Sequence, residues 1–149
     1  MDFPSRAPEH IDMPEALISG LGVKPLTVHK SSDIMAVFED EQTIRNINPD
    51  LQILSELNVV GIIITAPGNE ADFVSRFFAP RAGVNTDPVT GSVYFTLVPY
   101  WAKQLNKLTL QAVQLSQRGG KLVCTAKDNR VTIQGSAVTY LVGSILIPA

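Results

Sequence analysis

The residues best suited to chemistry lie in residues 83–92, which read GVNTDPVTGS. The segment places a carboxylate, Asp87, just before two small residues, Gly91 and Ser92, where a long helix is predicted to begin. First-turn N–H groups of a helix are unpaired and attract anions, and a small residue lets a ligand approach the backbone. Asp87 could exchange a proton with a ligand held there. The pattern equally fits a plain helix start, with Asp87 as the N-cap and Pro88 at the first helical position.

A second candidate is the turn Arg118, Gly119 and Gly120 between two predicted strands. It is either a ligand-facing turn that presents a cation or an ordinary β-turn with an exposed arginine. Cys124 falls inside the strand that follows, with no histidine nearby in the sequence. We therefore interpret Cys124 as a core residue and not as a nucleophile.

The remaining reactive residue types are too few to build a metal or cofactor site. One cysteine excludes a disulfide framework, and His10 and His29 alone do not make a zinc set. No dinucleotide fingerprint or phosphate loop is present. We predict no metal and no cofactor.

Composition predicts a single folded domain over residues 1–149. The chain is 45% hydrophobic and 17% charged, which excludes disorder. Residues 1–75 hold 12 acidic and 4 basic side chains, and residues 76–149 hold 2 acidic and 8 basic ones. The basic residues are dispersed, so a nucleic-acid partner is not expected. No apolar run approaches the about 20 residues that span a membrane, and no leader is visible, so we expect a cytoplasmic protein without a membrane partner.

The elements that must position these residues follow from hydrophobic patterning and turn signals. Short helices are predicted at 14–21, 39–46 and 51–57, and a long helix at about 89–106. Strands are predicted at 26–29, 34–38, 59–65, 72–78, 108–115, 121–126, 130–134 and 138–147. The long helix is apolar on nearly all faces, which indicates that protein surrounds it. The prediction is an α+β domain with a curved, mostly antiparallel sheet or barrel around one central helix.

Several segments resemble the phenazine-biosynthesis PhzF-like isomerase family. They are DFP at 2–4, DFVSRFFAP at 72–80, DPVTGS at 87–92, PYWA at 99–102, SQRGG at 116–120 and RVTI at 130–133. The resemblance implies the diaminopimelate epimerase-like fold, in which two similar lobes each wrap a sheet around a helix and enclose the active site between them. It covers only the second lobe. The first lobe, which carries the family's acid/base glutamate, would precede Asp2.

The resemblance also assigns roles to residues. Asp87 matches the family's cleft aspartate, and Gly91 and Ser92 match positions expected to hold a substrate carboxylate. We extend this substrate-binding set to Thr90, Tyr94, Arg118, Gly119 and Gly120. The sequence departs from the family pattern at Thr86, where an acid is usual, and at residues 93–95, where VYF replaces a small residue, His and Cys.

These observations leave several hypotheses open. The first is a cofactor-independent isomerase acting on a small carboxylate in a biosynthetic process, assembled as a homodimer of single lobes with Asp87 of each chain across the cleft. The second is a binding module for small carboxylates without turnover. A third is one half of a split isomerase that needs a first-lobe partner chain, and a fourth is a relic or fragment.

Overall fold

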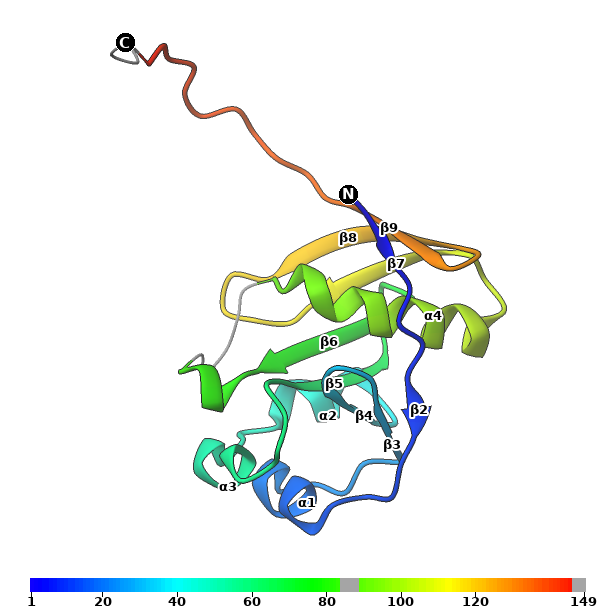
Figure 1. Cartoon of the computed structure of the whole chain (residues 1–149), viewed down its shortest axis with the longest axis vertical. Coiled ribbons are helices and arrows are strands. Elements are labelled where there is room, and N and C mark those ends of the chain that lie inside the picture. Colours follow the sequence, from blue (N-terminus) through cyan, green and yellow to red (C-terminus); the bar gives the residue numbers. More distant parts are fainter. Residues whose placement is uncertain (84–88, 146–149) are drawn as a thin grey trace.

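The residues that the structure describes form a nine-stranded mixed sheet with helices on both faces (Figure 1). The computed structural model describes residues 1–83 and 89–145. The strands, in chain order, are β1 (Asp2–Pro4), β2 (Glu9–His10), β3 (Thr27–Lys30), β4 (Ile34–Val37), β5 (Ile62–Pro67), β6 (Phe73–Phe78), β7 (Thr109–Gln114), β8 (Gly120–Lys127) and β9 (Arg130–Gln134). Their spatial order is β1-β9-β8-β7-β6-β5-β4-β3-β2.

Neighbouring strands are mostly antiparallel, as predicted. Only β4 with β5 and β6 with β7 run parallel. In the β6–β7 pair Ser75 lies opposite Gln114, and in the β7–β8 pair Gln114 lies opposite Gly120. This register brings the end of β7 and the start of β8 together at one edge of the molecule.

One face of the sheet packs against the long helix. A 3₁₀ turn (Gly91–Val93) leads into α4 (Tyr94–Leu105), so the predicted helix exists but is shorter than 89–106. Apolar side chains from β4 through β9 form a single core cluster with α4, and the largest are Phe73, Tyr94 and Trp101. Leu97 and Val98 of α4 are completely buried in the same cluster.

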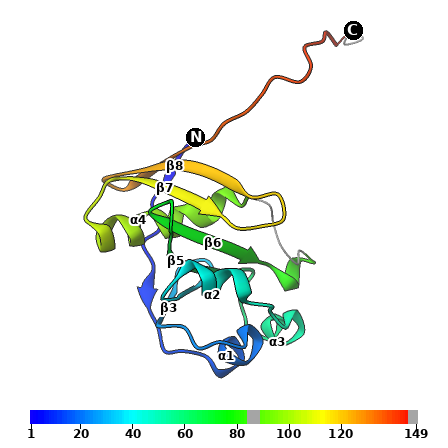
Figure 2. The ribbon, with the colours of Figure 1, turned by 180° about the vertical axis from the view of Figure 1, so that it is seen from behind.

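The opposite face of the sheet packs against three short helices: α1 (Glu15–Leu21), α2 (Glu41–Asn46) and α3 (Leu51–Ser55). Figure 2 shows α2 lying over this face, with α1 and α3 beside it. Aspartates start two of these helices: Asp40 Oδ1 accepts from Thr43 N at 2.7 Å, and Asp50 Oδ1 accepts from Gln52 N at 3.0 Å. Helices of this length leave most of their backbone N–H groups without an intrahelical acceptor, so these N-caps are needed.

A proline inside α4 ties the N-terminal segment to the helix. Pro99 has no N–H, so the carbonyl of Phe95, four residues earlier, lacks its intrahelical donor. The N–H of Arg6 donates to this oxygen instead, at 2.9 Å. The neighbouring Ser5 N–H donates to Asn129 O at 2.7 Å. The segment that follows β1 is therefore held between α4 and the β8–β9 turn.

We expect Pro99→Ala to release Arg6 from the helix. The substituted alanine would supply the missing N–H to Phe95 O, and a local helical bond forms in preference to a distant one. The amide of Arg6 should then exchange with solvent about tenfold faster, measured by hydrogen exchange in NMR spectra. The amide of Ser5 is the internal control, since its acceptor is unchanged. Undiminished protection of Arg6 would contradict this account.

A buried carboxylate joins α2 to the loop before β6. Glu41 Oε1 accepts from Arg45 Nε at 2.8 Å, and Oε2 accepts from Asn69 N at 2.9 Å. The N–H of Asn69, with help from the Arg45 guanidinium, holds the pKa of Glu41 below its ordinary value despite the opposing effect of burial. The carboxylate is thus bound in its ionised form.

Glu41→Gln should lower the free energy of unfolding by about 1–2 kcal/mol at neutral pH, because a charge-assisted contact is lost. The pKa of Glu41 is lower in the folded chain than in the unfolded one, so its contribution is complete above the ordinary pKa of about 4.3. It is lost as the pH falls through the folded pKa. Urea unfolding of both proteins should therefore show a difference that shrinks in acid. A difference independent of pH would refute the assignment.

The predicted strand at 138–147 is wrong over the part that the structure describes. Residues 138–145 form no strand and extend away from the sheet (Figure 1). The physical reason lies at the edge of β9, where β1 pairs with Asp2 opposite Thr132 and Pro4 opposite Arg130. Because β8 occupies the other edge, β9 has no free side left.

Across residues 1–83 and 89–145, none of the helices has the length and apolar character needed to cross a bilayer.

Candidate functional site

The start of α4 is fixed by a buried glutamine on β7. Thr90 N donates to Gln114 Oε1 at 2.9 Å, and Gln114 Nε2 donates to Thr90 Oγ1 at 3.4 Å. The Gln114 side chain is completely buried. Sequence reasoning missed this residue, although a polar side chain at an inward-facing position of an alternating strand is a signal for such a role.

Two backbone donors are left open next to this anchor. Val93 N donates to Thr90 O at 3.4 Å, which begins the 3₁₀ turn. Within the described part of the chain, no acceptor is recorded for the N–H groups of Gly91 and Ser92. Ser92 is exposed, and a Cβ added at Gly91 would meet no atom within 4 Å. This arrangement suits the oxygens of an anion that reaches the helix start.

The second predicted segment lies beside the first. A Cβ at Gly120 would overlap Val89 Cγ2, so the start of β8 contacts the residue that leads to Thr90. Gly119 has a φ of 68°, which favours glycine, and its N–H donates to Ser116 Oγ at 2.9 Å. The structure thus brings Gly119 and Gly120 to the helix start.

Arg118 occupies the turn between β7 and β8, and its side chain is exposed. It is therefore open to solvent, and its contact with a ligand stays a prediction.

The side chain of Tyr94 points into the core. It is completely buried, and its ring lies 6.2 Å from that of Phe73. Its hydroxyl has no hydrogen-bond partner among the described residues, and burial raises the pKa of the phenol above its ordinary value. The hydroxyl therefore stays protonated at neutral pH, and its contact with a ligand also remains a prediction.

The predicted acid/base residue, Asp87, lies outside the described residues. Cys124 is buried, and burial raises the pKa of its thiol to about 12, which agrees with a core residue and not with a nucleophile. Within residues 1–83 and 89–145, no group of three His, Cys, Asp or Glu side chains is placed to hold a metal ion.

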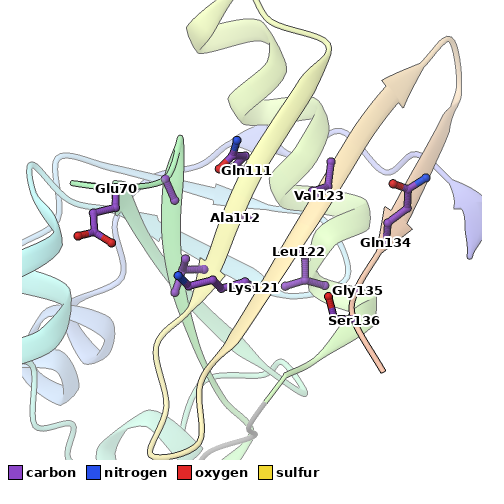
Figure 3. A pocket seen from close by; sticks show the side chains of 11 residues that line it. Glu70, Gln111, Ala112, Lys121, Leu122, Val123, Gln134, Gly135 and Ser136 are labelled. Atoms are coloured by element: carbon purple, nitrogen blue, oxygen red, sulfur yellow. The ribbon is translucent and has the colours of Figure 1, made fainter. Parts of the chain in front are cut away.

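A cavity lies away from these residues, on the sheet face not covered by α4. It has a volume of about 380 Å³ and is lined from β7, β8 and the end of β9 (Figure 3). Gln111, Lys121 and Gln134 supply its polar lining, and Glu70 lies at its margin. None of the predicted site residues that the structure describes lines this cavity.

Comparison with known proteins finds relatives that are named as isomerases or as PhzF family proteins. The chain is 45% identical over 146 residues to an uncharacterized isomerase of Pseudomonas aeruginosa, covering 97% of this chain and 56% of the relative. It is 41% identical over 151 residues to an uncharacterized isomerase of Halalkalibacterium halodurans, covering 99% and 57%. A crystal structure of a phenazine biosynthesis PhzF family protein from Enterococcus faecalis matches with a TM-score of 0.86 at 43% identity, covering 92% of this chain and 55% of that one.

The chain thus spans somewhat more than half the length of these relatives. The family model described as phenazine biosynthesis-like protein, PhzC-PhzF, matches residues 2–143. With nearly the whole chain matched by this model, and with identities above 40% to relatives of the same type, the chain belongs to the PhzC-PhzF family of phenazine biosynthesis-like proteins.

Proposed function

We propose that this chain is the second lobe of a PhzF-family isomerase with the diaminopimelate epimerase-like fold, in which the sheet wraps around α4. In this proposal the lobe acts on a small carboxylate by proton transfer and needs no cofactor. Asp87 donates or accepts the proton, and the backbone N–H groups of Gly91 and Ser92 hold the carboxylate. The setting is cytoplasmic and biosynthetic.

The observation that carries the proposal is the pair of open N–H groups at the start of α4. Gln114 and Thr90 fix their position, so binding does not have to order them first. Asp87 stands only four residues before Gly91 in the sequence, which keeps a carboxyl group close to the bound anion. A proton donor or acceptor next to a fixed carboxylate is the minimum that isomerisation by proton transfer requires.

A second surface must complete the cleft, and we propose that a second copy of this chain supplies it. Residues 136–145 carry large apolar side chains that are 80% to 99% exposed: Val138, Tyr140, Leu141, Val142 and Ile145. Exposed apolar segments of this kind mark association surfaces. In a two-fold dimer, Asp87 of each chain would face the other across the cleft, and the two carboxyl groups could share a proton.

Two alternatives use the same site. In one, the chain is half of a split isomerase, and a first-lobe partner chain supplies the other acid/base group. In the other, Gly91, Ser92 and Arg118 bind a small carboxylate without turnover. The exposed Arg118 in the β7–β8 turn favours the second of these.

The test is solvent deuterium exchange. The protein is incubated in D₂O with a panel of amino-acid carboxylates, beginning with L-glutamate, and loss of the Cα proton is followed by NMR. The native mass is measured by light scattering in the same buffer. We expect exchange by a dimer, and a loss of about 100-fold or more in Asp87→Asn, the effect of removing a general acid/base. Asp128→Asn is the matched control, because Asp128 lies in the distant β8–β9 turn.

Each outcome separates the hypotheses. Exchange that survives in Asp87→Asn would remove Asp87 from the mechanism. Saturable binding by calorimetry without exchange would favour the binding module. A monomer that neither binds nor exchanges would refute the homodimer, and activity restored by a separate first-lobe chain would establish the split enzyme.

A further inference from the structure

A basic hollow lies on the side of the sheet opposite α4, between the C-terminal end of α2 and the start of α3. Its volume is about 390 Å³. Its two charged lining residues are both arginines, Arg45 and Arg76, and no carboxylate is among the described residues that line it. Asn48 and Gln117 add exposed amide groups at its rim.

Arg76 is held rigidly at this hollow. Its Nη1 donates to Ile44 O at 2.9 Å and to Ile47 O at 2.7 Å, at the C-terminal end of α2. The guanidinium carbon lies 4.9 Å from the centre of the Phe78 ring. These contacts fix the plane of the guanidinium without neutralising its charge.

The remaining donors of Arg76 are uncommitted. No acceptor is recorded for its Nε or Nη2 among residues 1–83 and 89–145, and none of the ion pairs in that part of the chain includes it. Arg76 is half-buried, and burial lowers the pKa of its guanidinium. A desolvated cation without a counter-charge is costly, and a bound anion would offset that cost.

Arg45 adds a second cation at the same hollow. Its Nε and Nη2 both donate to Glu41 Oε1, which orients the side chain, and Nη1 has no recorded acceptor in the described part of the chain. Because Glu41 balances Arg45, the excess positive charge of the hollow belongs to Arg76.

We infer that this hollow is a second binding site, for a small oxyanion. Nε and Nη2 of the Arg76 guanidinium donate to the anion, and Arg45 contacts it from α2. Planar guanidinium groups bind carboxylate and phosphate oxygens in pairs, so both ligand types share the required chemistry. The site is separate from the start of α4, because Arg76 and its partners lie on the face packed by α1, α2 and α3. It therefore does not depend on the proposed isomerase activity.

The test is an NMR titration of the ¹⁵N-labelled protein with inorganic phosphate and, in parallel, with malonate, at ionic strength held constant with sodium chloride. We expect saturable shifts of the Arg76 Nε–H signal and of the Asn48 amide groups with at least one anion. The anion that saturates at lower concentration identifies the ligand class as phosphate or carboxylate. Loss of one charged contact should weaken binding about tenfold in Arg45→Gln.

A matched arginine gives the control. Arg81 Nη1 donates to Leu57 O at 3.3 Å and to Asn58 Oδ1, so it also contacts a backbone carbonyl, in the loop after α3, but it does not line the hollow. Arg81→Gln should leave the affinity unchanged. Arg76→Lys keeps the charge and loses the planar edge, so it should also bind at least about tenfold more weakly. Shifts that stay linear with both anions, or an Arg45→Gln protein that binds as the parent does, would overturn the inference.

Discussion

Replacing Trp101 by alanine should lower the free energy of unfolding by about 3–5 kcal/mol, the usual cost of removing a large buried aromatic side chain. Trp101 is 4% exposed, and its ring stacks on Phe73 with centroids 5.7 Å apart and planes 6° from parallel. Its Nε1 donates to Thr65 Oγ1 at 3.0 Å, and that hydroxyl donates to Val74 O at 2.7 Å. The substitution therefore removes packing between α4 and the sheet together with a buried hydrogen bond.

Trp101→Phe separates these two contributions. Phenylalanine keeps an aromatic ring near Phe73 but loses the donor to Thr65 and part of the buried indole volume, while the Thr65 hydroxyl retains Val74 O as acceptor. We expect a loss of about 1–2 kcal/mol for this variant. Unfolding in urea should be followed by circular dichroism, because Trp101 is the single tryptophan of the chain and fluorescence would disappear with it. A loss below about 1 kcal/mol in the alanine variant would show that α4 is not anchored here.

The second large effect is expected at Gly61, just before β5. A Cβ at this position would overlap Cε2 and Cζ of Phe77 and lie 2.9 Å from Asp33 Oδ1. Phe77 is 8% exposed in the core cluster, so its ring has little freedom to move. Gly61→Ala should therefore lower the free energy of unfolding by about 2–3 kcal/mol through overpacking.

Two further variants test the cause. Gly135→Ala is the matched control, since a Cβ there meets no atom within 4 Å, and its effect should stay within about 0.5 kcal/mol. Phe77→Leu removes the ring atoms that cause the overlap, so Gly61→Ala should cost less in that background than alone. Equal costs in both backgrounds would mean that the Phe77 ring is not what excludes a side chain at Gly61.

Local patterning was sufficient to predict most helices and strands. The apolar, β-branched run before Pro67 predicts a buried strand, and the structure has β5 there. The acidic residues at 39–41 predict a helix start, and α2 begins there, with Asp40 as its N-cap. These predictions succeed because capping and periodicity act within a few residues.

Contacts between distant segments were not predictable in the same way. The tail after β9 has the residue types of a strand, but β1 occupies the edge that such a strand would use. Nothing in the local sequence of residues 138–145 reveals this competition, because it depends on which segment reaches β9.

Only part of the candidate site was predictable, because the rest depends on contacts between distant segments. The motif identified the helix start at Gly91 and the turn at Gly119, and the fold brings them together. The side chain that fixes Thr90, Gln114, belongs to β7 and is recognisable only once the register of β7 on β6 is known. The inward direction of Tyr94 likewise follows from the packing of α4 and not from its position in the motif.

The pairing of β1 with β9 has a consequence for synthesis of the protein. The Met1 ammonium donates to Ile133 O at 2.9 Å, a contact between residues 132 positions apart. β1 therefore leaves the ribosome long before β9, the strand that it pairs with, and Arg6 must also wait for α4. Closing so long a loop costs conformational entropy. The hydrogen bonds between β1 and β9 offset this cost only when both strands are present. The nascent chain thus completes its sheet only after β9 has emerged, and until then β1 is an unpaired strand exposed to chaperones and proteases.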